Sequence, residues 1–447
     1  FANSYPEGGK PGYAENKNRN ANFYLNGGYV YDGRYLLDVN LRSDGTSVFG
    51  ANKRFSTTWS VGLAWNVHRE KFMKDKASFI NVLKLRGSVG NPGNQNFSSY
   101  SAITTYYFNN WMLNNFGTGV LVSKFGDPNL AWQRTLDKNI GINLSMFSNR
   151  FHVTVDFYHK RTDPLIADIG IPVSMGVEKR RTNIGVQVDK GVNGTIRYAI
   201  LYKPQESINY TMSVNFRYGT AFYKNIGRSL NAYNQENISK NLTSYYDGGS
   251  PTALWAVRSR GIDPATGQEI FVKKDGTLTY TFDYKDEVEV GDSRPTLEGV
   301  WGNTFYYKGW SASLQLRYSF GADVFNSTLF NKVENISSRS ITTNQDRRAL
   351  YNRWKKPGDK AKFKSISLTE STPMSSRFVM KENYLSIESV RLGYQFDSKW
   401  LKKALRISSL NINMYMNSIA RFSTLEDERG LYYPFARSIS FSLGAIL

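Results

Sequence analysis

Residues 139–158 alternate strictly between apolar and polar side chains on both sides of a short turn at Ser148-Asn149. The apolar positions are Ile140, Ile142, Leu144, Met146, Phe151, Val153, Val155 and Phe157. A period of two puts these side chains on one face of each strand and the polar ones on the other. The pattern predicts a β-hairpin whose apolar face is either buried in a water-soluble sandwich or turned to lipid in a membrane barrel.

The same alternation recurs along the chain and predicts about thirteen strands. Their centres lie within residues 23–31, 35–41, 59–65, 83–89, 139–146, 151–158, 196–200, 210–216, 299–305, 310–320, 390–396, 410–416 and 439–447. The dipeptides Asp32-Gly33 and Lys308-Gly309 each separate two alternating runs, which favours tight hairpins at both places.

The connections between these predicted strands alternate in length. Those at 32–33, 66–79, 147–150, 202–207, 308–309 and 397–404 are mostly short, whereas those at 43–54, 91–131, 160–190, 219–295, 321–376 and 419–435 are mostly long. Outer-membrane barrels have short periplasmic turns and long extracellular loops, and a soluble sandwich has no reason for such an asymmetry. The sequence therefore predicts an all-β fold, a transmembrane antiparallel β-barrel with long extracellular loops. Val153, Val155, Leu314 and Leu316 are its predicted lipid-facing residues.

The strand count bears on domain organisation. If the last apolar strand ends at the periplasmic side, counting back makes the first strand run toward the periplasm. Single-chain bacterial barrels have an even number of strands and both ends in the periplasm. We therefore expect residues 1–447 to be the C-terminal part of a larger barrel, unless the count is wrong by one.

Composition narrows the class further. Aromatic residues make up 15% of the chain, more than soluble domains use, and they girdle membrane barrels. The mean hydropathy is −0.47, and no apolar run reaches the roughly 18 residues that a spanning helix needs. This excludes a helical membrane protein. The absence of cysteine excludes disulfides and suits an oxidising compartment.

The formal charge of +20 indicates large, solvated basic loops, or else contact with anionic lipid headgroups or an acidic partner. Nucleic acid is not an expected partner, because the basic residues are scattered through strands and loops.

Nine short motifs follow one another along the chain: residues 42–50 (RSDGTSVFG), 83–95 (LKLRGSVGNPGNQ), 127–133 (DPNLAWQ), 156–163 (DFYHKRTD), 183–192 (NIGVQVDKGV), 261–267 (GIDPATG), 291–295 (GDSRP), 307–310 (YKGW) and 353–359 (RWKKPGD). In composition and order they resemble the motifs of the SusC/RagA group of TonB-dependent outer-membrane transporters. The chain departs at Asn193, where the group usually has Glu, and at Leu447, where it mostly has Phe.

The resemblance implies a barrel of about 22 strands whose lumen holds an N-terminal plug, with a TonB box ahead of the plug. Neither plug nor TonB box is recognisable in residues 1–447, so we expect contact with the TonB complex through a region outside them. The resemblance also implies a SusD-like surface lipoprotein as a lid, outer-membrane lipid around the wall, and a homodimer or larger assembly. The expected location is the outer membrane of a Gram-negative bacterium.

Three functions remain open at this stage. The first is active import of large nutrients, such as oligosaccharides or peptides, energised through TonB and assisted by the SusD-like lipoprotein. The second is a structural subunit of a larger outer-membrane complex without transport of its own. The third is a passive, porin-like channel with an open lumen.

Candidate binding chemistry is sparse. Tyr106, Tyr107 and Trp111 lie in a long predicted loop, where they either stack on substrate rings or pack the loop and the lid interface. The three histidines, His68, His152 and His159, lack the spacing of a metal or catalytic site, so we expect neither an enzyme nor a resident metal. An acidic run, Asp283, Asp286, Glu287, Glu289 and Asp292, lacks EF-hand spacing. A solvated loop is the expected reading and loop Ca²⁺ the alternative, with no other cofactor.

Overall fold

The structure is a computed structural model. It describes residues 15, 17, 19–47, 52, 54–74, 77–94, 103–114, 117–171, 173–237, 242–336, 342, 344–366, 371–397, 402–403, 406–425 and 437–446. Three residues that carried the family resemblance, Phe49, Gly50 and Gln95, lie outside these ranges, as does Leu447, where the chain departs from the family pattern.

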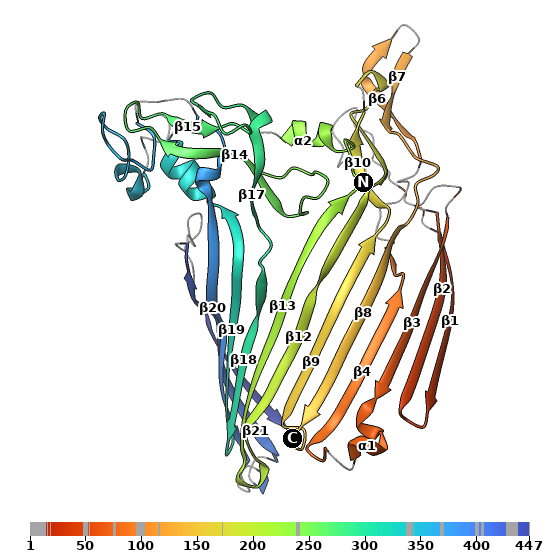
Figure 1. Cartoon of the computed structure of the whole chain (residues 1–447). Helices are drawn as coiled ribbons and strands as arrows, with labels where there is room; N and C mark the ends of the chain where they lie inside the picture. Colours follow the sequence, from red (N-terminus) through yellow and green to blue (C-terminus); the bar gives the residue numbers. More distant parts are fainter. Residues whose placement is uncertain are drawn as a thin grey trace, which may run out of the picture.

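One curved antiparallel sheet dominates the fold (Figure 1). Its thirteen main strands are β1 (Asn20–Tyr31), β2 (Tyr35–Thr46), β3 (Phe55–Asn66), β4 (Ile80–Gly90), β8 (Gln133–Met146), β9 (Phe151–Thr162), β12 (Val186–Lys203), β13 (Ile208–Lys224), β18 (Leu297–Tyr307), β19 (Trp310–Phe325), β20 (Val379–Phe396), β21 (Ser409–Ser423) and β22 (Ile439–Ile446). They pair in chain order, and the short strand β5 (Gly93–Asn94) adds to the end of β8. The predicted strand number and order are confirmed.

The connections divide between the two ends of the sheet as predicted. At one end lie tight turns and two short connections with helical segments: η3 (Val67–Arg69) with α1 (Lys71–Lys74), and η5 (Pro204–Glu206). Asp32 and Gly33 both have positive φ, as do Lys308 and Gly309, the conformation of tight hairpin turns. All the long connections lie at the other end, at the top of Figure 1.

The long connections contain structure that the alternation did not predict. Two hairpins occur, β6 (Thr105–Asn114) with β7 (Gly117–Lys124) and β10 (Leu165–Gly170) with β11 (Lys179–Ile184). A small sheet is formed by β14 (Ala253–Ile262), β15 (Glu269–Val272), β16 (Leu278–Thr279) and β17 (Glu287–Asp292). Helical segments are η4 (Val173–Met175), α2 (Asn231–Asn237), η6 (Tyr284–Asp286), the π-helix η7 (Leu329–Glu334), η9 (Arg347–Leu350) and η10 (Ser376–Phe378). None of the helices in the described ranges is long and apolar enough to cross a membrane.

Cross-strand register keeps the apolar and polar positions apart. Ile142 of β8 lies opposite Leu85 of β4 and Val155 of β9. One residue further, Asn143 lies opposite Lys84 and Thr154. Residues directly opposite each other on adjacent strands point to the same side of the sheet. One face of the sheet is therefore apolar and the other is polar.

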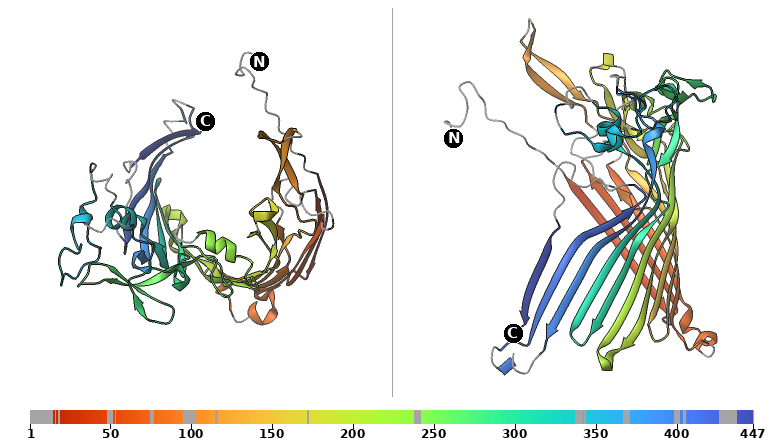
Figure 2. Two further views of the ribbon diagram at one scale, coloured as in Figure 1. Left: turned by 90° about the horizontal axis from the view of Figure 1, so that it is seen from above. Right: turned by 90° about the vertical axis from the view of Figure 1, so that its left-hand side faces the viewer.

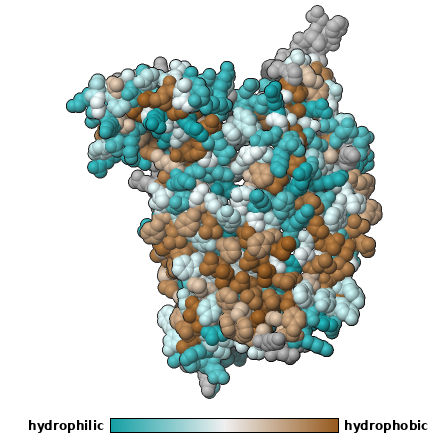
Figure 3. All heavy atoms as spheres, in the orientation of Figure 1, coloured by the Kyte–Doolittle hydropathy of each residue, from teal (hydrophilic) through white to brown (hydrophobic). Residues whose placement is uncertain are grey.

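The apolar face is the outer, convex one. Seen from above, the sheet forms an open arc (Figure 2), and a hydrophobic band crosses the outside of the wall below the more hydrophilic loops (Figure 3). Large apolar side chains on this wall are exposed, for example Ile140 at 67% and Leu63 at 60%. Soluble proteins rarely expose contiguous apolar surface on this scale, so this wall is not built for contact with water.

Some strands are longer at the loop end than predicted. β12 begins at Val186 and β13 continues to Lys224, so the predicted loops 160–190 and 219–295 were too wide. β20 begins at Val379, and register shifts in its pairing break the period of two. Alternation therefore marks only the part of each strand where one face is uniformly apolar.

The sheet does not close on itself. Among the described residues, β1 pairs with β2 alone and β22 pairs with β21 alone, so both are edge strands. They lie on opposite sides of the gap in the arc (Figure 2), and their side chains are exposed throughout. Such edges present rows of unpaired backbone groups.

Candidate functional site

The inner face of the sheet is a wall of hydrogen-bonding side chains. Arg86 of β4 pairs with Asp156 of β9 at 2.6 Å and donates to Asn143 of β8 at 3.2 Å. On other strands, Thr195 Oγ1 donates to Asn215 at 2.8 Å, and Arg391 Nη2 donates to Asn413 at 2.8 Å. These contacts join adjacent strands or, for Arg86 and Asp156, reach across β8, because the polar residues of the alternating pattern point inward.

This wall retains unused hydrogen-bonding capacity. A pocket of about 650 Å³ lies against β1–β4 and β8, with Asn26, Asn40 and Asn139 in its lining. The oxygens Asp137 Oδ1 and Asp156 Oδ1 are buried yet accept no hydrogen bond. The side-chain amides that line the pocket can both donate and accept hydrogen bonds, so the inner wall can contact a polar occupant of the interior.

A second candidate region stands at the loop end, beside the ends of β19 and β20. We call the described residues of 253–292 and 326–378 the loop lobe. In Figure 2 this lobe lies at the outer side of the arc. Its apolar centre comprises Phe330, Val333, Phe363 and Phe378, so these loops have a hydrophobic core of their own.

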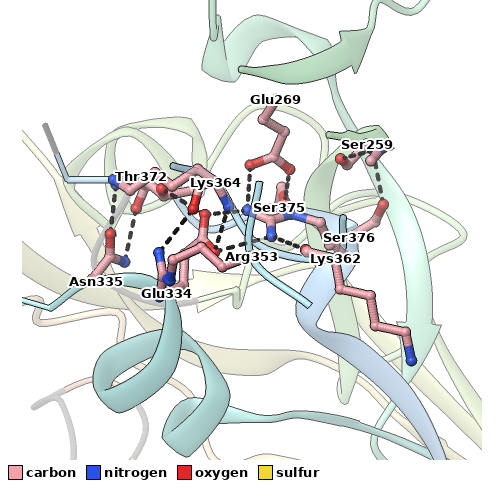
Figure 4. A network of polar contacts seen from close by, with 12 residues as sticks. Ser259, Glu269, Glu334, Asn335, Arg353, Lys362, Lys364, Thr372, Ser375 and Ser376 are labelled. Carbon is pink, nitrogen blue, oxygen red and sulfur yellow. Dashed lines mark hydrogen bonds and ion pairs between the residues drawn. The ribbon is translucent and has the colours of Figure 1, made fainter. Parts of the chain in front are cut away.

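A buried ionic network joins the two halves of the loop lobe (Figure 4). Arg377 Nη2 contacts Glu269 of β15 at 2.9 Å and Glu334 of η7 at 2.6 Å. Ser375 Oγ donates to Glu269 at 2.6 Å, and Thr372 Oγ1 donates to Glu334 at 3.0 Å. The Glu334 side chain is fully buried and that of Arg377 is 11% exposed. The network therefore links the β13–β18 connection to the β19–β20 connection.

Two further cations complete this network. Arg353 is buried and donates to the backbone oxygens of Ala349, Lys364 and Val333. Burial lowers the pKa values of both Arg353 and Lys364. Burial also acts to lower the pKa of Arg377, but its hydrogen bonds to Glu334 and Glu269 outweigh this and raise it. The charges that contact carboxylates directly are thus the ones held most firmly in ionised form.

Two of the sequence motifs meet in the loop lobe. Trp354 Nε1 donates to the Pro264 oxygen at 2.9 Å, and Gly358 N donates to the same oxygen at 2.8 Å. A Cβ on Gly267 would lie 2.6 Å from the Trp354 ring, and Gly267 has φ of +74°. The motifs 261–267 and 353–359 are therefore two sides of one packing contact. Because the two motifs are far apart in the sequence, the sequence alone did not predict this contact.

The predicted loop aromatics lie in another place. Tyr106 and Tyr107 are in strand β6 of the β6–β7 hairpin, exposed at 64% and 48%. As consecutive strand residues they point to opposite faces of the hairpin. Trp111 lies in the same strand, and its side chain is outside the described part. The hairpin stands apart from the loop lobe in Figure 1, so these aromatics and the ionic network do not form one site.

The four predicted lipid-facing residues share the apolar face. Val153 lies opposite Leu144 and Ile196, and Val155 lies opposite Ile142. On the other side of the arc, Leu314 lies opposite Val390, and Leu316 lies opposite Trp301 and Ile387.

Carboxylates of the acidic run accept hydrogen bonds at turns and strand ends. Asp283 accepts from Lys285 N at the start of η6, Asp286 accepts from Lys274 N, and Asp292 accepts from Thr252 Oγ1. Within the described ranges, no three His, Asp or Glu side chains are grouped closely enough to hold a metal ion.

Comparison with known proteins assigns the class. The family described as TonB dependent receptor-like, beta-barrel, matches residues 1–336, more than half of the chain. The protein belongs to this family. Its fold matches the structure of the RagAB peptide transporter with a TM-score of 0.81 at 20% identity, covering 92% of this chain and 44% of that one.

Two relatives specify the group. TonB-dependent receptor P39 of Formosa agariphila is 27% identical, with coverage of 91% of this chain and 43% of the relative. TonB-dependent receptor SusC of Bacteroides thetaiotaomicron is 24% identical, with coverage of 93% and 42%. Together these similarities confirm the resemblance to the SusC/RagA group. The chain spans less than half the length of either relative.

The ionic network yields a first prediction. Arg377→Met leaves the fully buried Glu334 carboxylate without its cation, which we expect to destabilise the loop lobe by about 3–5 kcal/mol. Amide hydrogen exchange in residues 362–378 then becomes faster. Arg347→Met, at an exposed arginine, is the control and leaves exchange unchanged. Unchanged protection in Arg377→Met would show that the network does not hold the two connections together.

A second prediction concerns pH. Burial raises the pKa of the Glu287 carboxyl in β17, with Lys274 opposing it. Since its folded-state pKa lies above the unfolded value, the stability it provides is present below about pH 4 and is lost as pH rises through the folded pKa. We expect Glu287→Gln to slow hydrogen exchange in β14 and β17 at neutral pH but not near pH 4. The exposed Glu178→Gln is the control, and an equal gain at both pH values would contradict the prediction.

Proposed function

We propose that the protein is an outer-membrane active importer of large nutrients, energised through TonB and working with a SusD-like surface lipoprotein. The observation that carries this proposal is the thirteen-strand sheet with an apolar convex face, a polar concave face and long connections at one end only. Family membership supports the same function.

The membrane orientation follows from that arrangement. We infer that Val153, Val155, Leu314 and Leu316 face lipid, since they lie in the outer apolar face. The tight turns then lie in the periplasm and the loop lobe lies outside the cell, as is usual for such barrels.

Barrel closure requires partners for β1 and β22. An unpaired backbone group in hydrocarbon costs several kcal/mol, so both edge strands need neighbours. We infer that this sheet is the C-terminal part of a barrel of about 22 strands. A plug in the lumen would contact the polar inner face, where Asn26, Asn40 and Asn139 line a pocket. The TonB box would belong with that plug.

The proposed partner and substrate rest on similarity to the SusC/RagA group. RagAB is described as a peptide transporter, and its match to this fold supports a peptide or a similar large solute as cargo. We propose that the SusD-like lipoprotein covers the loop end, where the exposed Tyr106 and Tyr107 are available to contact it or the substrate.

The importer proposal predicts an energy requirement. Deleting the gene in its native host should abolish growth on one class of large nutrient, and depleting TonB should reproduce that defect. Restoring the wild-type gene is the control. Growth that needs the gene but persists without TonB would indicate a passive channel. Unchanged growth on every nutrient, with loss of an outer-membrane complex, would indicate a structural subunit.

The lipid-facing assignment predicts a depth-dependent cost. Leu314→Arg should lower the free energy of unfolding from lipid vesicles by about 2–4 kcal/mol, because a charged side chain near mid-membrane is poorly solvated. Gln315→Arg, one residue along β19 on the inner face, is the matched control and should cost much less. Equal costs for both variants, or a Leu314→Arg protein that folds as a water-soluble monomer, would overturn the assignment.

A further inference from the structure

A pocket of about 740 Å³ opens between the loop lobe and the ends of the barrel strands. Its described lining includes Gly261 from the β13–β18 connection, Lys362 from the β19–β20 connection, Met380 from the start of β20 and Leu425 from the β21–β22 connection. This volume lies in the range of small-ligand sites, which are mostly apolar with a few placed polar groups.

One part of the pocket is apolar and firmly supported. Phe363 and Phe378 belong to the hydrophobic centre of the loop lobe, and Leu329 packs against that centre. Met380 and Leu425 add apolar surface from β20 and from the end of β21. Such a wall can receive an apolar side chain of a ligand, because the contact removes apolar surface of both partners from water.

The charged residues among the described lining are all cationic, but two of them are already neutralised. Arg377 is held by Glu269 and Glu334, and Arg348 makes a two-pronged contact with Asp346, with Nη2 at 2.7 Å and Nε at 3.0 Å from its carboxylate oxygens. Neither guanidinium is therefore available as a net charge for a ligand.

Lys362 differs from both arginines. Its side chain is exposed, and within the described ranges its ammonium has no hydrogen-bond or ion-pair partner. Figure 4 shows the side chain extending away from the carboxylates of the network. Its backbone is fixed, because Lys362 N donates to Asn352 O at 2.7 Å and Lys362 O accepts from Arg377 Nη1 at 2.7 Å. The lysine is thus an uncompensated charge on a rigid support.

The surrounding sequence strengthens this positive field. Residues 344–366 contain eight Lys or Arg and two Asp. Asp346 is engaged by Arg348, and Asp359 accepts backbone donors from Lys355 and Lys356. None of the described lining residues is acidic, so an anion approaching this part of the pocket meets a net positive potential.

We propose that this pocket binds the free carboxylate end of a peptide whose last side chain is apolar. Lys362 pairs with the carboxylate, Asn352 stands beside it, and Leu329, Phe363 and Met380 receive the side chain. A neutral sugar fits less well, because its hydroxyl donors need many acceptors and the described lining residues include no carboxylate. The extracellular setting of the pocket rests on the proposed import function, whereas the binding chemistry does not.

The test uses the full-length protein purified in detergent and titrated with acetyl-Ala-Ala-Phe, as the free acid and as the C-terminal amide. We expect the acid to bind about two- to fivefold more tightly, the range of a partly exposed ion pair. Lys362→Gln should remove this preference and Lys362→Arg should keep it. Lys360→Gln, at an exposed lysine outside the lining, should also keep it.

Other outcomes overturn the proposal. Equal binding of acid and amide, or a preference that survives Lys362→Gln, excludes Lys362 as the carboxylate partner. Competition by a glucuronate disaccharide as strong as that by the peptide acid excludes the peptide as the preferred ligand. The titration needs neither TonB nor transport. A protein that binds the peptide but does not import therefore disproves only the import function, and one that imports without this preference disproves only the pocket.

Discussion

The need to pair every backbone hydrogen-bonding group governs this structure. In hydrocarbon no water can satisfy an N–H or C=O group, so a spanning sheet must be a continuous ladder. The main strands between β1 and β22 in the large sheet meet this need with neighbours on both sides. Once the ladder is fixed, side chains alternate between its two faces, and solvation of the outer face decides which residues stand there. The wall consequently has no packed interior, and the compact apolar clusters lie among the loops, around Ile226 and around Phe378.

The loop lobe is stabilised in a different way. It has a small apolar cluster and, beside it, charges that are nearly inaccessible to water, with Glu334 fully buried. Removing ions from water is expensive, so a buried pair adds little net stability compared with apolar packing. It does make any arrangement that separates the partners costly. Arg377 binds carboxylates from two different connections, and only their observed juxtaposition satisfies both. The network thus selects one docking of these loops.

Sequence reasoning captured the wall because its determinant is local. The alternation through Ile142 and Val155, or through Leu314 and Leu316, reports directly which way each side chain points. It failed where that cue ended, as in β20, whose register shifts interrupt the period. The loop lobe was not predictable by this route. Pro264 and Trp354 lie 90 positions apart, and the sequence around neither residue predicts their hydrogen bond. Motif resemblance marked both segments without indicating that they touch.

The distribution of charge connects these two levels. A formal charge of +20 could be spread evenly over solvated loops, but the segment 344–366 concentrates eight basic residues around two aspartates. These basic residues include both buried and exposed side chains. Arg353 and Lys364 are buried and interact with the buried Glu334 carboxylate, so their charge contributes to loop docking. Lys355, Lys356, Lys360 and Lys362 are exposed, and the two aspartates of the segment are already engaged. The buried cations fix the shape of the surface on which the exposed ones act, so the same network that orders the loops also determines where an anion is attracted.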